Sequence, residues 1–213
     1  MKKNKLERRA YSFEVKAEDT EEGSILTGRP IVYNSRTNLG YFDEIIESGA
    51  LDNADLTDVR FLVNHNTSMI PLARSRRNNG NSTMKLTPDP FGLNMDFVKL
   101  DTKNNMDAKA LRSAVDRGDI TGMSFMFSVD DEEWEDLESD HPTRHIRKIG
   151  SVVEVSAVTF PAYESTEINA RSKEALENAR STLEKVRQQS EKPLDSGNEL
   201  ELLKEKTKIL GGK

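Results

Sequence analysis

The stretch from residue 152 to residue 160 reads VVEVSAVTF and points to a fold built from β-strands. β-Branched side chains dominate it, and they fit the pleated surface of a strand better than the crowded turns of a helix. Side chains alternate between the two faces of a strand, so Glu154 shares a face with Ser156. A carboxylate in so apolar a strand requires a cationic or N–H partner.

Further strand-sized runs precede this stretch, with turn residues between them. We expect strands at Tyr11–Ala17, Ile25–Tyr33, Tyr41–Ile46, Val59–Asn64, Met84–Leu86, Leu93–Leu100, Met123–Val129 and His145–Phe160, the last with a possible break at Gly150. Runs at this density are typical of a closed or nearly closed antiparallel sheet. The expected fold class is therefore α+β and dominated by strands.

Two helices are expected to interrupt the sheet, at residues 107–117 and 50–56. The first carries alanine, leucine and valine at helical spacing and stops at Gly118, a residue suited to the position after a helix. Residues 130–140 are acidic and contain Trp134, and we expect them to form a solvated loop.

The length and composition predict one domain and an appendage. The chain has 213 residues, of which 35% are hydrophobic and 32% charged, enough for one domain of about 150 residues. The character changes near residue 163, so we expect a domain of residues 1–163 and a helical, partly flexible tail of residues 164–213. The tail carries an apolar stripe from Leu176 to Val186, which suits either a partner-facing helix or a helix packed on its own domain. Residues 199–213 read as a short amphipathic helix.

Several functional classes are disfavoured by what the sequence lacks. The absence of cysteine excludes disulfides, thiolate metal sites and cysteine nucleophiles. A net charge of −6 argues against a general nucleic-acid binder. The sequence contains no apolar run of about 18 residues, so we expect neither a membrane span nor a signal peptide. The three histidines lack metal-ligand spacing, and no nucleotide-binding glycine pattern or G-x-S-x-G elbow occurs. We therefore expect no cofactor and no metal.

Three residues suit nucleophilic catalysis: His65 at the end of one apolar run, Ser124 inside a second, and Glu154 inside a third. A serine hydroxyl becomes a good nucleophile when a base takes its proton, and the base works best when a third group orients it. Each residue also has a plain alternative. His65 suits a strand end, and Ser124 suits the solvent face of a strand.

The role of Glu154 is the most open of the three. It can pair with His65 if their strands are neighbours, or it can form a structural ion pair with Arg147 or Lys148. His141 and His145 compete with it for the third catalytic role, but both lie in a charged stretch that favours exposure.

Six blocks of sequence, in the same order, resemble the prohead (capsid maturation) proteases of tailed phages of the HK97 type. They cover roughly residues 10 to 171. The first block has two parts, at residues 28–34 and 42–51, and the other five stand at residues 61–66, 71–74, 89–93, 118–127 and 154–163. Two positions depart from the pattern of the family. Met126 and Ala73 stand where the family often has glycine, which bears on the substrate groove rather than on a proposed catalytic atom.

The resemblance implies a fold shared with the herpesvirus assembly proteases, an antiparallel β-barrel flanked by helices with the nucleophile on a strand. It also implies Ser124 as nucleophile, His65 as general base and Glu154 as the orienting acid. The herpesvirus enzymes use Ser-His-His, and Glu154 stands at the position that resembles their second histidine.

The function expected from this resemblance is that of a serine endopeptidase. Its substrates would be the major capsid protein with its scaffolding segment, and its own chain, inside the assembling procapsid in the host cytoplasm. Self-association is left open. The alternative is a non-enzymatic scaffold, a β-rich head with a helical tail that binds capsid subunits.

Overall fold

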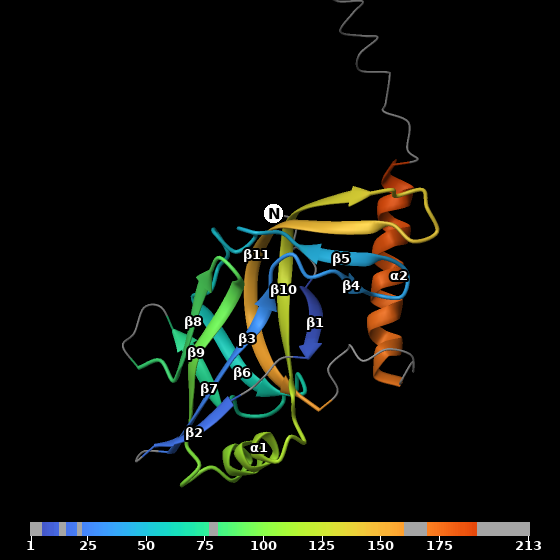
Figure 1. Ribbon diagram of the computed structural model, residues 1–213. Helices are drawn as coiled ribbons and strands as arrows, with labels where there is room; N and C mark the ends of the chain where they lie inside the picture. The colour runs from blue at the N-terminus through green and yellow to red at the C-terminus, as the bar shows by residue number, and fades with distance from the viewer. Residues whose placement is uncertain (1–5, 13–15, 21–22, 77–80, 160–169, 191–213) are drawn as a thin grey trace, which may run out of the picture.

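The computed structural model describes residues 6–12, 16–20, 23–76, 81–159 and 170–190. These residues form two β-sheets and two helices, so the α+β, strand-dominated class is confirmed (Figure 1). The larger sheet contains seven strands and the smaller sheet four. The smaller sheet runs in the order β2 (Lys16–Thr20), β3 (Gly23–Val32), β9 (Gly92–Leu100) and β8 (Met84–Asp89), and all its pairs are antiparallel.

The larger sheet is built on a long hairpin of β10 (Gly122–Glu135) and β11 (Thr143–Val158). The edge strand β1 (Leu6–Ser12) pairs with β10, and β5 (Asp43–Ile46) joins the sheet to β4 (Thr37–Asn38). The sheet branches at β11, because β6 (Asp58–Val63) also pairs with this strand. β6 pairs in turn with β7 (Ala73–Arg76).

Two of these pairings are parallel, which corrects the expectation of a wholly antiparallel sheet. The start of β11 pairs in parallel with β5, and its end pairs in parallel with β6. The long strand thus offers one edge to two short strands in succession. The strand pairing joins neither sheet into a closed barrel, so the expected barrel is not confirmed.

The acidic segment at residues 130–140 was expected to form a loop, but strand β10 continues through it as far as residue 135. Residues 131–135 of β10 pair with residues 143–148 of β11, and β11 continues through Gly150 without a break. Charge explains the pairing, because Arg144 and Arg147 on β11 bind acidic residues of β10. Trp134 is partly buried and lies edge-on against Phe42, with ring centroids 4.8 Å apart.

The main core lies between the two sheets. Leu26, Leu93 and Val98 of the smaller sheet belong to the same apolar cluster as Phe125 and Val155 of the larger sheet. Helix α1 (Met106–Asp116), close to the expected 107–117, adds three buried side chains to this core. Its first turn is capped by the side chain of Asn105, and Gly118 follows it with a φ of +73°.

The segment at 50–56 forms consecutive turns and not the expected helix. Its backbone bonds connect residues three apart, from Ala50 to Glu47, from Asp52 to Gly49 and from Ala54 to Leu51. The carbonyl of Ala50 accepts a backbone hydrogen bond from β11, and Asp55 both donates to and accepts from the backbone of that strand. The sheet therefore takes the backbone groups that a helix would need.

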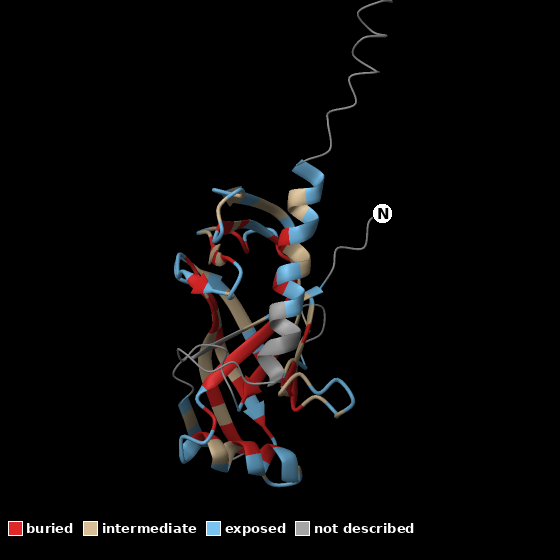
Figure 2. Ribbon diagram, turned by 90° about the vertical axis from the view of Figure 1, so that its right-hand side faces the viewer, coloured by how far each residue is buried: buried red, intermediate tan, exposed pale blue. Residues whose placement is uncertain are grey.

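Helix α2 (Ala170–Ser190) packs on the β-rich body, which answers the question that its apolar stripe left open. Ala179 and Leu183 are buried in a second apolar cluster with Phe42, against which Trp134 also packs. Arg187 donates to two backbone carbonyls of the turn between β10 and β11. The rest of the described helix surface is largely exposed (Figure 2). The division of the chain near residue 163 stays a prediction, and the helix expected at 199–213 lies outside the described residues.

Candidate active site

Ser124 lies on the face of β10 that points away from the main core. Its neighbours Met123 and Phe125 are core residues, so strand alternation turns the serine to the other face. There it stands opposite Ser156 of β11 on one side and opposite Ala10 of β1 on the other. The serine is fully buried (0% exposed), and a buried hydroxyl requires a hydrogen-bonding partner.

Glu154 lies on the same outer face of the sheet, two residues before Ser156. Its neighbour Val155 is in the main core, so the carboxylate points outward from it. Only 3% of the residue is exposed. The ion pair with Arg147 that the sequence left open does not form, because Arg147 binds Asp131 and Glu133 of β10.

His65 is held over this face by a tight turn at the end of β6. Asn64 and His65 both have positive φ values, +52° and +57°, a conformation that asparagine tolerates better than most residues. Three hydrogen bonds tie Asn64 to the end of β11 and the residue after it: its backbone N–H donates to Ala157 O, and its side chain exchanges two bonds with Thr159. The backbone N–H of His65 donates to Ser156 Oγ at 3.1 Å. The parallel pairing of β6 with β11 thus places the imidazole beside Glu154.

The three side chains form one continuous hydrogen-bonded chain. Ser124 Oγ lies 2.6 Å from His65 Nε2, and His65 Nδ1 is hydrogen-bonded to Glu154 Oε1. With the proton of the neutral ring on Nδ1 and donated to the carboxylate, Nε2 is left to accept from the serine. Chemically, such an arrangement can remove the proton from a serine hydroxyl as the oxygen attacks an electrophile.

A family model of caudovirus prohead serine proteases matches residues 11–181, most of the chain and all three of these residues. The chain belongs to the caudovirus prohead serine protease family. No match was found among curated proteins or among solved structures. The family resemblance read from the sequence is therefore confirmed, and the match extends into helix α2.

One residue of this candidate site was not singled out from the sequence. Ser156 Oγ donates to Glu154 Oε2 at 2.5 Å and accepts from the backbone N–H of His65. It is fully buried (0% exposed) and joins the acid to the turn that carries the histidine. Its alternation with Glu154 was a usable signal, because two polar residues on one face of an apolar strand favour a shared partner.

A second contact could not be read from the sequence. The backbone carbonyl of Arg9, on β1, lies 2.6 Å from Ser124 Oγ and accepts a hydrogen bond from it. Ser124 Oγ therefore lies between two acceptors, the ring nitrogen of His65 and a carbonyl of the N-terminal strand.

The other two histidines lie away from this site and have partners of their own. His145 pairs with Glu47 at 2.6 Å, and His141 pairs with Asp43 at 2.9 Å. Both stand near the start of the long strand that carries Glu154 near its end. Among the described residues, no group of three or more His, Cys, Asp or Glu side chains is placed to hold a metal ion.

Proposed function

We propose that the chain is a serine endopeptidase that cuts the capsid precursor during prohead maturation, with Ser124 as nucleophile, His65 as general base and Glu154 as orienting acid. The observation that carries the proposal is the continuous chain of hydrogen bonds from Ser124 Oγ through His65 to Glu154. The family match supports the class of reaction.

In the proposed mechanism Ser124 Oγ attacks the carbonyl carbon of a peptide bond, and His65 Nε2 takes its proton. Glu154 holds Nδ1 and stabilises the imidazolium that forms. When the tetrahedral intermediate collapses, His65 gives the proton to the departing amine and an acyl-enzyme remains. Water, deprotonated by the same imidazole, then releases the acid product and restores the serine.

The substrates that we propose are the major capsid protein with its scaffolding segment, and the chain itself. The site of action would be the interior of the assembling procapsid, in the host cytoplasm. Within the described residues no helix is long and apolar enough to cross a membrane. A fold shared with the herpesvirus assembly proteases is also proposed, on the resemblance of the sequence blocks.

The test is cleavage of the capsid precursor by the purified chain, followed by gel electrophoresis and mass spectrometry. Ser124→Ala and His65→Ala are expected to abolish the products. Ser128→Ala is the matched control, because Ser128 is also a buried serine of β10 but bonds Ser151 and no member of the triad. Full cleavage by either triad variant would overturn the assignment. A non-enzymatic scaffold, the alternative, would leave the precursor uncut with every version of the chain.

A further inference from the structure

The strand β1 occupies an edge of the larger sheet, beside β10, the strand that carries Ser124 (Figure 1). It pairs with β10 alone among the described strands, and its register places Ala10 opposite Ser124. The edge of a sheet is where an extended peptide can add as a further strand. The chain's own N-terminal strand therefore stands where a substrate peptide could pair beside Ser124.

The contact between Ser124 and this strand is unproductive. A serine hydroxyl has one proton, which it can donate to Arg9 O or to His65 Nε2 but not to both. Ser124 Oγ lies 2.6 Å from each of these two acceptors. Attack requires the oxygen to approach a carbonyl carbon, whereas here it faces a carbonyl oxygen. The strand thus covers the hydroxyl and competes with the base for its proton.

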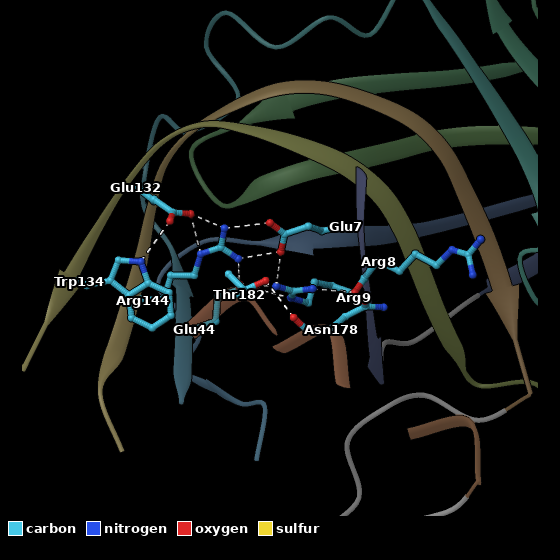
Figure 3. A network of polar contacts seen from close by, with 9 residues as sticks. All are labelled: Glu7, Arg8, Arg9, Glu44, Glu132, Trp134, Arg144, Asn178 and Thr182. Atoms are coloured by element: carbon cyan, nitrogen blue, oxygen red, sulfur yellow. Dashed lines mark hydrogen bonds and ion pairs between the residues drawn. The ribbon is translucent and has the colours of Figure 1, made fainter. Parts of the chain in front are cut away.

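A cluster of ion pairs holds β1 in this position (Figure 3). Glu7 of β1 accepts from Arg144 at 2.7 and 2.9 Å, and Arg9 of β1 donates two bonds of 2.5 Å to Glu44. The guanidinium of Arg9 also lies over the ring of Phe127, 5.6 Å from its centroid. The strand is therefore anchored to β11, β5 and β10 at once.

When β1 leaves the cluster, the charge of Arg144 does not become unpaired. This buried arginine also binds Glu44, at 3.0 Å, and Glu132, at 2.8 Å through its Nε. Both of these acids belong to strands other than β1. An unpaired buried charge is the main cost of breaking an ion pair, and here the arginine keeps two partners.

We propose that β1 is an intramolecular blocking strand, which keeps Ser124 covered until an extended substrate peptide replaces it along the edge of β10. The inference rests on the proposed protease function and deepens it, because it states how the site is held silent and which backbone edge the substrate takes. The peptide would pair antiparallel to β10, as β1 does.

A reversible crosslink tests this directly, because the chain has no cysteine of its own. Arg8→Cys with Met126→Cys places two thiols at directly opposed positions of β1 and β10, within reach of a disulfide. Labelling of Ser124 by a fluorophosphonate serine probe is then timed in the oxidised and reduced forms of the same full-length protein. Labelling at least tenfold faster after reduction is expected, and equal rates in the two forms would overturn the proposal.

A point variant gives a second measurement that needs no crosslink. Glu7→Gln weakens the anchor of β1 and is expected to speed labelling of Ser124 about threefold to tenfold. The matched control is Glu133→Gln, which breaks an exposed pair with Arg147 and should leave the rate unchanged. A Glu7→Gln rate equal to that of the control counts against the blocking role.

Failure of the protease function can be told apart from failure of this inference. If Ser124 is never labelled in any form, the proposed function is wrong. The blocking role is then decided by the double-cysteine protein that also carries Ser124→Ala. That protein is expected to bind the capsid precursor when reduced and not when oxidised, as measured by co-sedimentation. Equal binding in both states would show that β1 does not occupy the substrate edge.

Discussion

A buried carboxylate lies near each end of the long β10–β11 hairpin, and the two carboxylates have different kinds of partner. Near one end, Glu44 of β5 meets the guanidinium groups of Arg9 and Arg144. Near the other end, Glu154 of β11 meets the imidazole of His65 and the hydroxyl of Ser156. Both residues are almost fully buried, at 1% and 3% exposed. Burial alone therefore does not separate a structural carboxylate from a functional one.

The difference lies in what the partner can do with a proton. A guanidinium keeps its proton throughout the ordinary pH range, so the cluster around Glu44 can hold strands together but cannot transfer a proton. An imidazole can accept and return one near neutral pH. Substitutions at the two ends should therefore separate catalysis from stability.

The largest effect is expected from Glu154→Gln. The change keeps the size of the side chain but removes the charge that orients His65 and stabilises its protonated form. We expect kcat to fall about a thousandfold to ten-thousandfold, with little change in thermal stability. Peptide cleavage rates and a melting curve on the same preparation check this. A variant that loses its fold instead would show that Glu154 resembles Glu44 in its role.

The next largest effect is expected at Glu44 and should fall on stability and not on catalysis. Glu44→Ala removes one acidic partner from Arg9 and one from Arg144, although both arginines keep Glu7, so we expect a loss of about 2–3 kcal/mol in the free energy of unfolding. Urea unfolding measures it. Asp58→Ala, which breaks an exposed pair with Arg74, is the control and should cost about 1 kcal/mol or less.

The pH dependence of stability should come from the structural cluster. Burial by itself would raise the pKa of Glu7, but hydrogen bonding to Arg144 and the charges of Arg9 and Arg144 lower it to about 2, from an ordinary value of 4.5. A lowered pKa stabilises the fold above pH 4.5, and this stabilisation is lost as the pH falls from 4.5 towards 2. It amounts to at most about 3 kcal/mol at neutral pH.

The measurement is urea unfolding at a series of pH values, with Glu7→Gln as the comparison. The difference in stability between the two proteins should be constant above about pH 5 and shrink below it. A difference that stays constant down to pH 2 would show that the carboxylate of Glu7 is not held by the arginines.

The smallest effect is expected at Ser156, which hydrogen-bonds to Glu154 and to the backbone of His65. Ser156→Ala removes a hydrogen bond to a charged oxygen, and kcat should fall about tenfold. KM should not change, because the residue positions Glu154 and not the substrate. A rise in KM with constant kcat would place Ser156 in substrate binding instead.

Much of the fold could be predicted because apolar alternation is a local property. Most strand runs and helix α1 lie close to where their patterns place them. The parallel pairs of β11 with β5 and β6 could not be predicted, because the register between distant segments leaves no local trace. The extension of β10 to Glu135 was missed because its acidic residues suit solvent as well as they suit the basic strand opposite.

The candidate site also has some features that could be predicted from the sequence and others that could not. Ser124, His65 and Glu154 were selected by the order of sequence blocks, and the structure brings them together. The contact of Ser124 with Arg9 involves a backbone carbonyl. Every residue has such a carbonyl, so no pattern of side chains could predict the contact. In the sequence, Glu7 and Arg9 look like part of an ordinary charged N-terminus. Only the structure shows that they pair with the buried Arg144 and Glu44.

The turn that carries His65 has a consequence for the order of events in activation. Through Asn64 and Ser156 it is fastened to β11, the strand that also carries Glu154. His65 and Glu154 therefore form one preorganised unit whose hydrogen bonds do not involve β1. Once β1 departs, the reorganisation that remains is the rotation of a single hydroxyl proton towards Nε2. The proposed blocking role would thus let the site be assembled early, stored inactive and started quickly.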